Sequence, residues 1–414
     1  MHHTENRGHM GDTAKVDQDA VLRARVLLLG SGRLTAREQV GAYRVLAEVS
    51  PSAYLPKLVD ALIERSYELD EPELHVTLYA EALAAARRLH ADAPRREGRL
   101  GRALSGYEHA LFAAGRRAEG RALCEESAEA GRYGRLAVVL AEEGCHAEAA
   151  ELLGGHAGTG DADPASDWTL IEWAAELDAA GRQEEALEAF ARLVDDGRRG
   201  ASADSAPLAS LVWKLDRYAR MLGAAGRRDG EVAARHETLG LLTRLARGGE
   251  PVSRSNIQAL WATLLGLSGR PDEPAATSGA PLPAFGAHVF HGWSPDTRED
   301  YFASVALLER RTAALRASGD LPGLIVTQRR LTVRRALRGE SSGRRSEDAL
   351  RPSFDEGVAL ARLSPVDPGV LARALADRSM FLVAVKRYGE ALADFTEATA
   401  LLDGLAPPPI VTRT

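Results

Sequence analysis

The stretch LIEWAAELDAAGRQEEALEAFARL, residues 170–193, decides the fold predicted for this chain. Its first half spaces apolar residues at i, i+3, i+4 and i+7, on one face of a helix: Leu170, Trp173, Ala174 and Leu177. Gly181 can adopt the left-handed conformation that ends a helix. Ala186 and Phe190 then restart the apolar pattern four residues apart on a second helix. The stretch therefore predicts two antiparallel amphipathic helices joined by a tight glycine turn.

The glycine turn recurs along the chain, each time followed by a restart rich in Ala and Glu. Copies occur at 113–120 (AAGRRAEG), 142–152 (EEGCHAEAAEL), 224–235 (AAGRRDGEVAAR) and 267–276 (LSGRPDEPAA), and a copy with Lys in place of Gly at 383–398 (VAVKRYGEALADFTEA). One hairpin alone cannot bury both of its apolar faces, so such repetition predicts a stack of hairpins. The unequal spacing of the copies indicates irregular repeats.

The hairpin resembles the tetratricopeptide repeat, which places apolar, large, small and large residues on its first helix, then an alanine and an aromatic residue on its second. Here those positions are taken by Leu170, Trp173, Ala174, Leu177, Ala186 and Phe190, and in a C-terminal copy by Leu375, Ser379, Leu382, Tyr388, Ala391, Phe395 and Ala398. The copy departs at Arg378, where a large apolar residue is usual. The resemblance covers about 104–245 and 370–405. It implies an all-α, right-handed superhelical solenoid of antiparallel hairpins, whose concave surface suits a peptide or a partner helix.

Composition along the chain predicts five parts. Residues 270–300 hold five prolines and few helix formers, which indicates a loop or a linker between two helical blocks. We therefore expect a disordered tail, a first tetratricopeptide-like block, a Pro-rich linker, a second such block and a C-terminal tail: 1–18, 19–270, 271–300, 301–405 and 406–414.

The charge and hydropathy of the chain argue against several classes of partner. Its 52 basic and 59 acidic residues give a net charge of −7, which does not favour general nucleic-acid binding. No run of 18 apolar residues occurs, so we expect no membrane span. The polar N-terminus lacks the apolar centre of a signal peptide, which favours the cytoplasm. Only four basic residues are lysine, a bias typical of GC-rich, for instance actinobacterial, genomes.

Motifs that would indicate catalysis fail on spacing or context. GSGR at 30–33 lacks the spacing of a phosphate-binding loop. GESSG at 339–343 places Ser341 as in a nucleophile elbow, but a helical Arg-rich run precedes it and no histidine follows it. Cys124 and Cys145 lie too far apart for a metal knuckle or a redox pair. We therefore predict a protein without enzymatic activity or a cofactor.

The segment HVFHGWSPDTREDY, 288–301, is the most unusual in composition. Three of its side chains are potential metal ligands, though at loose spacing: His288, His291 and Asp296. Two alternatives remain for its aromatic residues Phe290, Trp293 and Tyr301. They pack against the flanking helices, or they form an exposed loop that anchors a partner. Under the second alternative, Trp293 and Tyr301 are candidate binding residues.

An arginine-rich block follows this segment. Residues 301–345 hold ten arginines against three acids, and Arg330, Arg334 and Arg338 form one row along a helix. The row is either a solvated face paired with acidic neighbours or a docking site for an acidic protein segment or a phosphate. The candidate binding residues of this block are Arg329, Arg330, Arg334 and Arg335.

The sequence thus predicts a binding module: a cytoplasmic scaffold or adaptor for a protein or peptide partner, with an acidic partner favoured by the arginines. The alternative is a ligand- or peptide-sensing regulator of a signalling or defence system. Chaperone-binding relatives of the tetratricopeptide family clamp a peptide carboxylate with Lys and Asn on the first helices. The two best copies carry neither there, so we do not expect a chaperone peptide as ligand: Ile171, Glu172, Ala175, Ala376, Asp377 and Met380.

Overall fold

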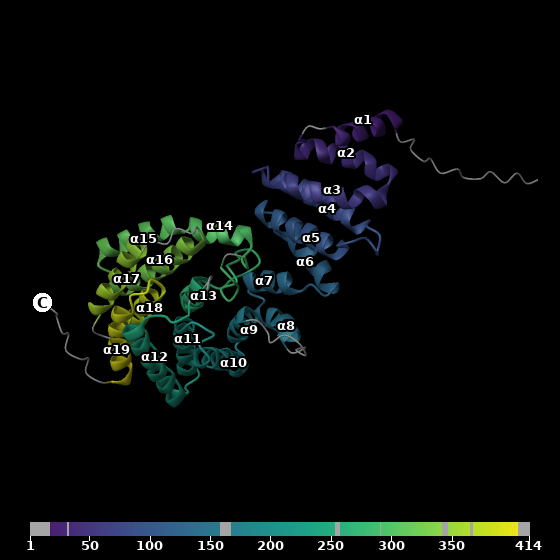
Figure 1. The fold of residues 1–414 in the computed structure, drawn as a ribbon. Helices are drawn as coiled ribbons and strands as arrows, with labels where there is room; N and C mark the ends of the chain where they lie inside the picture. Colours follow the sequence, from purple (N-terminus) through teal and green to yellow (C-terminus); the bar gives the residue numbers. More distant parts are fainter. Residues whose placement is uncertain are drawn as a thin grey trace, which may run out of the picture. The chain divides into compact units, whose positions relative to one another are not determined.

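A computed structural model describes most of the chain: residues 17–30, 33–157, 167–252, 257–289, 291–341, 347–364 and 367–404. In these ranges the regular elements are helices, and the single β-bridge joins Thr277 to Ala280 (Figure 1). The predicted all-α class is confirmed. The chain divides into two compact units, Met1–Leu123 and Cys124–Thr414, and the boundary falls within α6.

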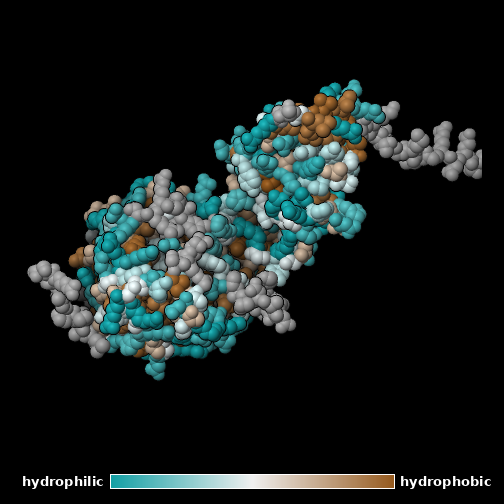
Figure 2. All heavy atoms as spheres, in the orientation of Figure 1, coloured by the Kyte–Doolittle hydropathy of each residue, from teal (hydrophilic) through white to brown (hydrophobic). Residues whose placement is uncertain are grey.

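In unit 1, each helix from α1 to α5 packs on the next along the chain. Local signals set the helix starts. Thr35 caps α2 in a reciprocal capping box with Glu38, and Pro51 occupies the first turn of α3. The outer helix α1 leaves apolar side chains exposed, Leu29 at 85%, and Figure 2 shows apolar atoms gathered there. The helices are α1 (Gln18–Leu29), α2 (Ala36–Val49), α3 (Pro51–Ser66), α4 (Pro72–Arg87), α5 (Arg96–Ala113) and α6 (Arg117–Glu129).

Unit 2 contains the remaining helices, and consecutive helices again pack together through α7–α12 and α14–α19. They are α7 (Gly134–Glu142), α8 (His146–Ala157), α9 (Asp167–Ala179), α10 (Gln183–Ser202), α11 (Leu208–Ala224), α12 (Arg228–Gly248), α13 (Ile257–Gly269), the short 3₁₀ helix η1 (Arg270–Asp272), α14 (Pro295–Ala303), α15 (Val305–Ser318), α16 (Leu321–Ser341), α17 (Glu347–Arg362), α18 (Pro368–Ala384) and α19 (Tyr388–Asp403).

The predicted hairpin at 170–193 is α9 and the first half of α10. Gly181 has φ +78°, the left-handed conformation predicted for it. Its apolar face is in the core, where Leu177 and Phe190 are almost fully buried. Gly269 behaves differently. Its φ is −84°, and the chain continues directly into η1 without a left-handed turn. The copy of the repeated phrase at 267–276 therefore does not form the predicted left-handed glycine turn.

The last helices of the chain return to the middle of unit 2. In Figure 1, α19 lies beside α12, and α13 packs against both α11 and α16. The indole of Trp213 on α11 donates to the carbonyl of Met380 on α18 at 3.1 Å. Helices from before and after 271–300 thus share one core. The structure divides the chain at residue 123, not at the segment predicted as a linker.

The Pro-rich segment 271–294 is itself packed, and we call it the strap. Its Leu282 N–H donates to the carbonyl of Glu142 at 2.9 Å, where α7 ends. Gly286 lies so close to α9 that a Cβ there would be 2.6 Å from that of Ala175. Gly144 is packed equally closely against the strap, since a Cβ there would lie 2.3 Å from the carbonyl oxygen of Ala276. The strap therefore covers the surface of α7 and α9 within unit 2.

Candidate functional site

The candidate aromatic residues hold the strap in place. Trp293 is 4% exposed and Tyr301 is 3% exposed, and their rings meet edge to face at 5.6 Å. Both rings also contact Phe285, and the indole N–H of Trp293 donates to the carbonyl of Ala284 at 3.0 Å. Trp293 and Tyr301 therefore pack inside the fold and do not form an exposed, partner-binding loop, since neither presents its ring on the surface. Phe290 lies outside the described residues.

The arginine row finds its acidic partner within the chain. Arg330 and Arg334 each reach Glu273 of the strap at 2.6 Å, and that carboxylate is almost completely buried. The guanidinium of Arg334 also lies over the ring of Tyr301, 4.2 Å from its centroid. Burial raises the pKa of Tyr301, so the phenol stays neutral. The row that suggested a docking site for an acidic segment thus already holds an acidic residue of its own chain.

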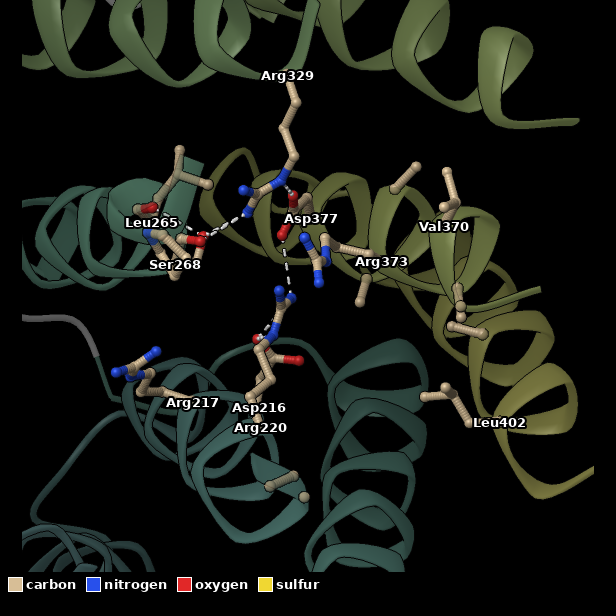
Figure 3. A pocket seen from close by; sticks show the side chains of 18 of the residues that line it. Asp216, Arg217, Arg220, Leu265, Ser268, Arg329, Val370, Arg373, Asp377 and Leu402 are labelled. Atoms are coloured by element: carbon tan, nitrogen blue, oxygen red, sulfur yellow. Dashed lines mark hydrogen bonds and ion pairs between the residues drawn. The ribbon is translucent and has the colours of Figure 1, made fainter. Parts of the chain in front are cut away.

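The other two candidate arginines have separate roles. Arg335 pairs with Glu309 at 2.7 Å near the surface. Arg329 is buried, and it donates to Asp377 at 2.8 Å and to the side chain of Ser268 at 2.9 Å, and also pairs with Asp272. Arg329 is therefore the one candidate residue that borders a cavity, because Asp377, Ser268 and Asp272 all line it as well (Figure 3).

The cavity lies inside unit 2 and has a volume of about 900 Å³. Its walls come from α11, α12 and α13 on one side and from α16, α17, α18 and α19 on the other. It exists because the last helices return to the middle of the unit. The lining combines apolar side chains with six arginines and six carboxylates, a composition that suits an amphipathic ligand.

One wall carries a buried ionic network centred on Asp377 of α18 (Figure 3). The two oxygens of this carboxylate accept from Arg220 of α11 at 3.0 Å and from Arg329 of α16 at 2.8 Å. Burial acts to raise the pKa of Asp377, but the two guanidinium groups outweigh it and hold the pKa below its usual value. Asp377 therefore stays ionised and ties three helices together.

Two neighbours on α11 complete this wall. Arg220 also contacts Asp216 at 3.0 Å, yet burial leaves the pKa of Asp216 raised. Arg217 pairs with Asp178 at 3.0 Å, while its buried Nε has no hydrogen-bond partner. Burial lowers the pKa of Arg217, and the nearby cations Arg220 and Arg270 add to that effect. The cationic charge at Arg217 is thus only partly compensated.

The remaining wall is apolar. Val370 on α18 and Leu402 on α19 project toward the cavity in Figure 3. Ile325, Val326 and Phe395 line it too. Val326 is among the more exposed large apolar residues of the unit, at 48%. An apolar surface next to a fixed ionic wall gives the cavity two chemically distinct sides.

Other sequence signals lie elsewhere. Gly30 ends α1 of unit 1, and Ser341 is the last residue of α16, so neither sits on a strand-to-helix turn. Within the described residues, no group of three or more His, Cys, Asp and Glu side chains is arranged to hold a metal ion. Cys124 is buried and Cys145 is partly buried. In the same part of the chain, no helix is both long and apolar enough to cross a bilayer.

Sequence reasoning missed most of the cavity. Arg217, Arg220 and Arg373 are charged residues on largely apolar helices, and only the return of α18 and α19 brings them together. Comparison with known proteins adds no further assignment, since no family model and no curated protein matches the sequence.

Proposed function

We propose that unit 2 is a right-handed superhelical stack of tetratricopeptide-like hairpins, and that it binds an extended peptide segment in the cavity between α11–α13 and α16–α19. Binding, not catalysis, is its task, and the protein acts as an adaptor or scaffold. The observation that carries this proposal is the cavity of about 900 Å³ with its ionic and apolar walls. Its volume falls in the range of natural ligand sites.

The strap supports the choice of this cavity over the surface of α7 and α9. In a tetratricopeptide stack, ligands lie along the first helix of each hairpin, here α7, α9 and α11. The strap already covers α7 and α9 through Leu282 and Gly286. It leaves α11 free to line the cavity with Arg217 and Arg220. The available binding surface therefore begins at α11.

The ionic wall supports binding without large rearrangement. Arg220, Asp377 and Arg329 hold one another across three helices before any ligand is present. A cavity whose polar groups are already fixed does not lose side-chain entropy when it binds, which favours affinity. The wall thus acts as a preformed side of the site.

A cavity-blocking variant tests the proposal. Gly357 on α17 lines the cavity, and a Cβ added there meets no atom within 4 Å. Gly357→Trp should therefore fill the cavity without breaking the fold. Gly389→Trp on α19 is the matched control, because Gly389 has the same open surroundings and does not line the cavity.

Both variants and the wild-type protein are incubated with a synthetic random octapeptide library, and retained peptides are identified by mass spectrometry. The proposal expects a set of peptides that wild type and Gly389→Trp retain and Gly357→Trp loses. If no retained peptide depends on Gly357, the cavity is not a peptide site.

A second candidate function is a sensor that changes shape on binding. It rests on the contact between α12 and α19, where Arg228 donates to the carbonyl of Leu402 at 2.6 Å and Arg235 pairs with Asp403 at 2.5 Å. Since Leu402 also lines the cavity, a ligand that contacts Leu402 would displace or stabilise this contact between α12 and α19. Solution scattering with a retained peptide separates the two functions: a sensor changes its radius of gyration, whereas a static scaffold does not.

A further inference from the structure

One cavity arginine has no partner. Six arginines line the cavity, and five of them are paired: Arg217 with Asp178, Arg220 with Asp216 and Asp377, Arg228 and Arg235 with Glu231, and Arg329 with Asp272 and Asp377. Arg373 on α18 makes no ion pair or hydrogen bond with any residue in the described part of the chain, and its side chain is exposed.

The carboxylates beside Arg373 are already used. Asp377 lies one turn further along α18, but its two oxygens accept from Arg220 and Arg329. Asp367 caps the start of α18 by accepting from the backbone N–H of Gly369 at 2.8 Å. In the described structure neither acid forms an ion pair with Arg373, and Asp367 is engaged as the cap of its own helix.

The other lining carboxylates are equally occupied. Asp178 and Asp216 accept from Arg217 and Arg220, while Asp272 and Glu231 belong to the pairs of Arg329 and Arg235. At the same time, the buried Nε of Arg217 stays without an acceptor. Asp367 is the one lining carboxylate without a cationic partner in the described residues, and it serves as a helix cap. The guanidinium of Arg373 and the Nε of Arg217 are thus available as cationic donors to an added anion.

Apolar side chains flank the unpaired arginine. Val370 lies one turn before Arg373 on the same face of α18, and Ala374 follows it. Leu402 and Phe395 reach the cavity from α19. In Figure 3, Arg373 is drawn between the ionic wall at Asp377 and the apolar side chain of Val370. A ligand at this point meets one cation within a largely apolar surface.

We propose that the cavity selects peptides in which a carboxylate pairs with Arg373 and neighbouring apolar side chains contact Val370, Leu402 and Phe395. This inference rests on the proposed peptide-binding function and names its ligand class: acidic residues set among apolar ones. Guanidinium groups favour carboxylates because two parallel N–H donors match the two oxygens. The carboxylate is either that of an Asp or Glu side chain or the free C-terminus of the peptide.

Two forms of the octapeptide library distinguish these sources. In one library every C-terminus is amidated, so only side chains supply carboxylates; in the other the C-termini are free. Enrichment of Asp and Glu in the amidated library assigns the side chain. Enrichment that requires the free C-terminus, without Asp or Glu, assigns the terminal carboxylate.

Charge reversal tests the role of Arg373 itself. Arg373→Gln should weaken the best retained peptide by about tenfold or more, as expected for loss of a charge-assisted hydrogen bond. Arg373→Glu should change the preference of the library from acidic to basic residues, a result that misfolding cannot produce. Arg310→Glu is the control, because Arg310 is exposed on α15 and does not line the cavity.

The outcomes separate this inference from the function on which it rests. Suppose that wild type retains peptides and Gly357→Trp loses them. If those peptides show no enrichment of carboxylates, or if they bind Arg373→Gln as tightly as wild type, the inference is wrong and the proposed peptide site stands. If no peptide depends on Gly357, both fail together. Retained acidic peptides whose affinity depends on Arg373 support both.

Discussion

Arg329 of α16 and Asp377 of α18 form an ion pair of 2.8 Å, although 48 positions separate them in the chain. Their contact is buried on both sides and is shared with Arg220 of α11. Through Arg220, Asp377 therefore couples the last helices of the chain to the helices that precede the strap. It also fixes the polar wall of the cavity.

Removing the shared carboxylate should be costly. Asp377→Asn removes the negative charge and one of the two acceptor oxygens that two buried arginines share. Breaking a buried pair from one side costs about 3–5 kcal/mol. We expect urea unfolding of unit 2 to shift to lower denaturant by a corresponding amount. Glu184→Gln is the control, since Glu184 and its partner Arg227 are both exposed and such pairs contribute about 0–1 kcal/mol. Equal effects of the two changes would contradict the central role of Asp377.

The strap should make stability depend on pH through Glu172 of α9. Burial, with the charge of Glu176 nearby, raises the pKa of Glu172 to about 7. An unfolded Glu has a pKa of about 4.3, so the folded state favours the neutral carboxyl. The contribution of the neutral Glu172 carboxyl to the free energy of unfolding is complete below about pH 4 and is lost as pH rises through about 7. His288 lies in the same region, and burial lowers its pKa as well, so a variant is needed to isolate Glu172.

Glu172→Gln supplies that variant. It keeps the shape of the neutral carboxyl and cannot ionise, so it should stabilise the protein at pH 8 relative to wild type and have little effect at pH 4. The gain should be roughly 1–3 kcal/mol, because one pKa unit corresponds to about 1.4 kcal/mol. Chemical denaturation at the two pH values measures it. The same change at Glu188, which is exposed on α10, should show no such pH-dependent gain.

Contact between the strap and the turn before α8 can be measured by a pair of glycine substitutions. Gly144 and Gly181 have nearly equal φ, +80° and +78°, so an alanine is strained to a similar extent at both. A Cβ at Gly181 meets nothing within 4 Å, whereas one at Gly144 meets the carbonyl of Ala276 at 2.3 Å. Gly181→Ala should cost about 1 kcal/mol.

Gly144→Ala should cost more, by roughly 1–3 kcal/mol, because the strap must move away from α7. Hydrogen exchange of the strap amides gives an independent reading, and the Leu282 N–H should lose protection only in Gly144→Ala. Equal losses of stability in the two variants, with no change in exchange at Leu282, would mean that the strap is not held against this turn.

The sequence could predict the elements whose cause is local. Periodic apolar residues and Gly181 lie within one hairpin, so the pattern of α9 and α10 is complete in 170–193. The place of the strap could not be predicted in this way. Its contacts join residues that are far apart in the chain, such as Ser294 and Glu142, 152 positions apart. The prediction of a Pro-rich loop over 271–300 is correct for the described residues of 273–294, but 295–300 form the start of α14, because a proline is accepted in the first turn of a helix. The prolines carry no information about what the strap packs on.

The candidate site illustrates the same limit. Arg330 and Arg334 were correctly placed on one helical row, because a row follows from helix geometry alone. Their partner Glu273 lies outside that helix, 57 and 61 positions before them. The sequence alone therefore could not distinguish a row paired within the chain from a docking site for an acidic partner. The cavity could not be predicted from any one helix, since its walls meet where α16, α18 and α19 pack against α11, α12 and α13.

The copy of the repeated turn that lacks glycine gives a final prediction. Lys386 joins α18 to α19 and has φ +63°, the left-handed conformation in which a side chain is strained by about 1 kcal/mol. Lys386→Gly should relieve this strain and stabilise unit 2 by about 0.5–1 kcal/mol, after allowance for the greater freedom of glycine in the unfolded chain. Thermal or urea unfolding measures the change. Arg387→Gly is the control, because Arg387 has φ −90° and glycine there should only destabilise. A loss of stability in Lys386→Gly would show that the lysine side chain contributes more than its backbone strain costs.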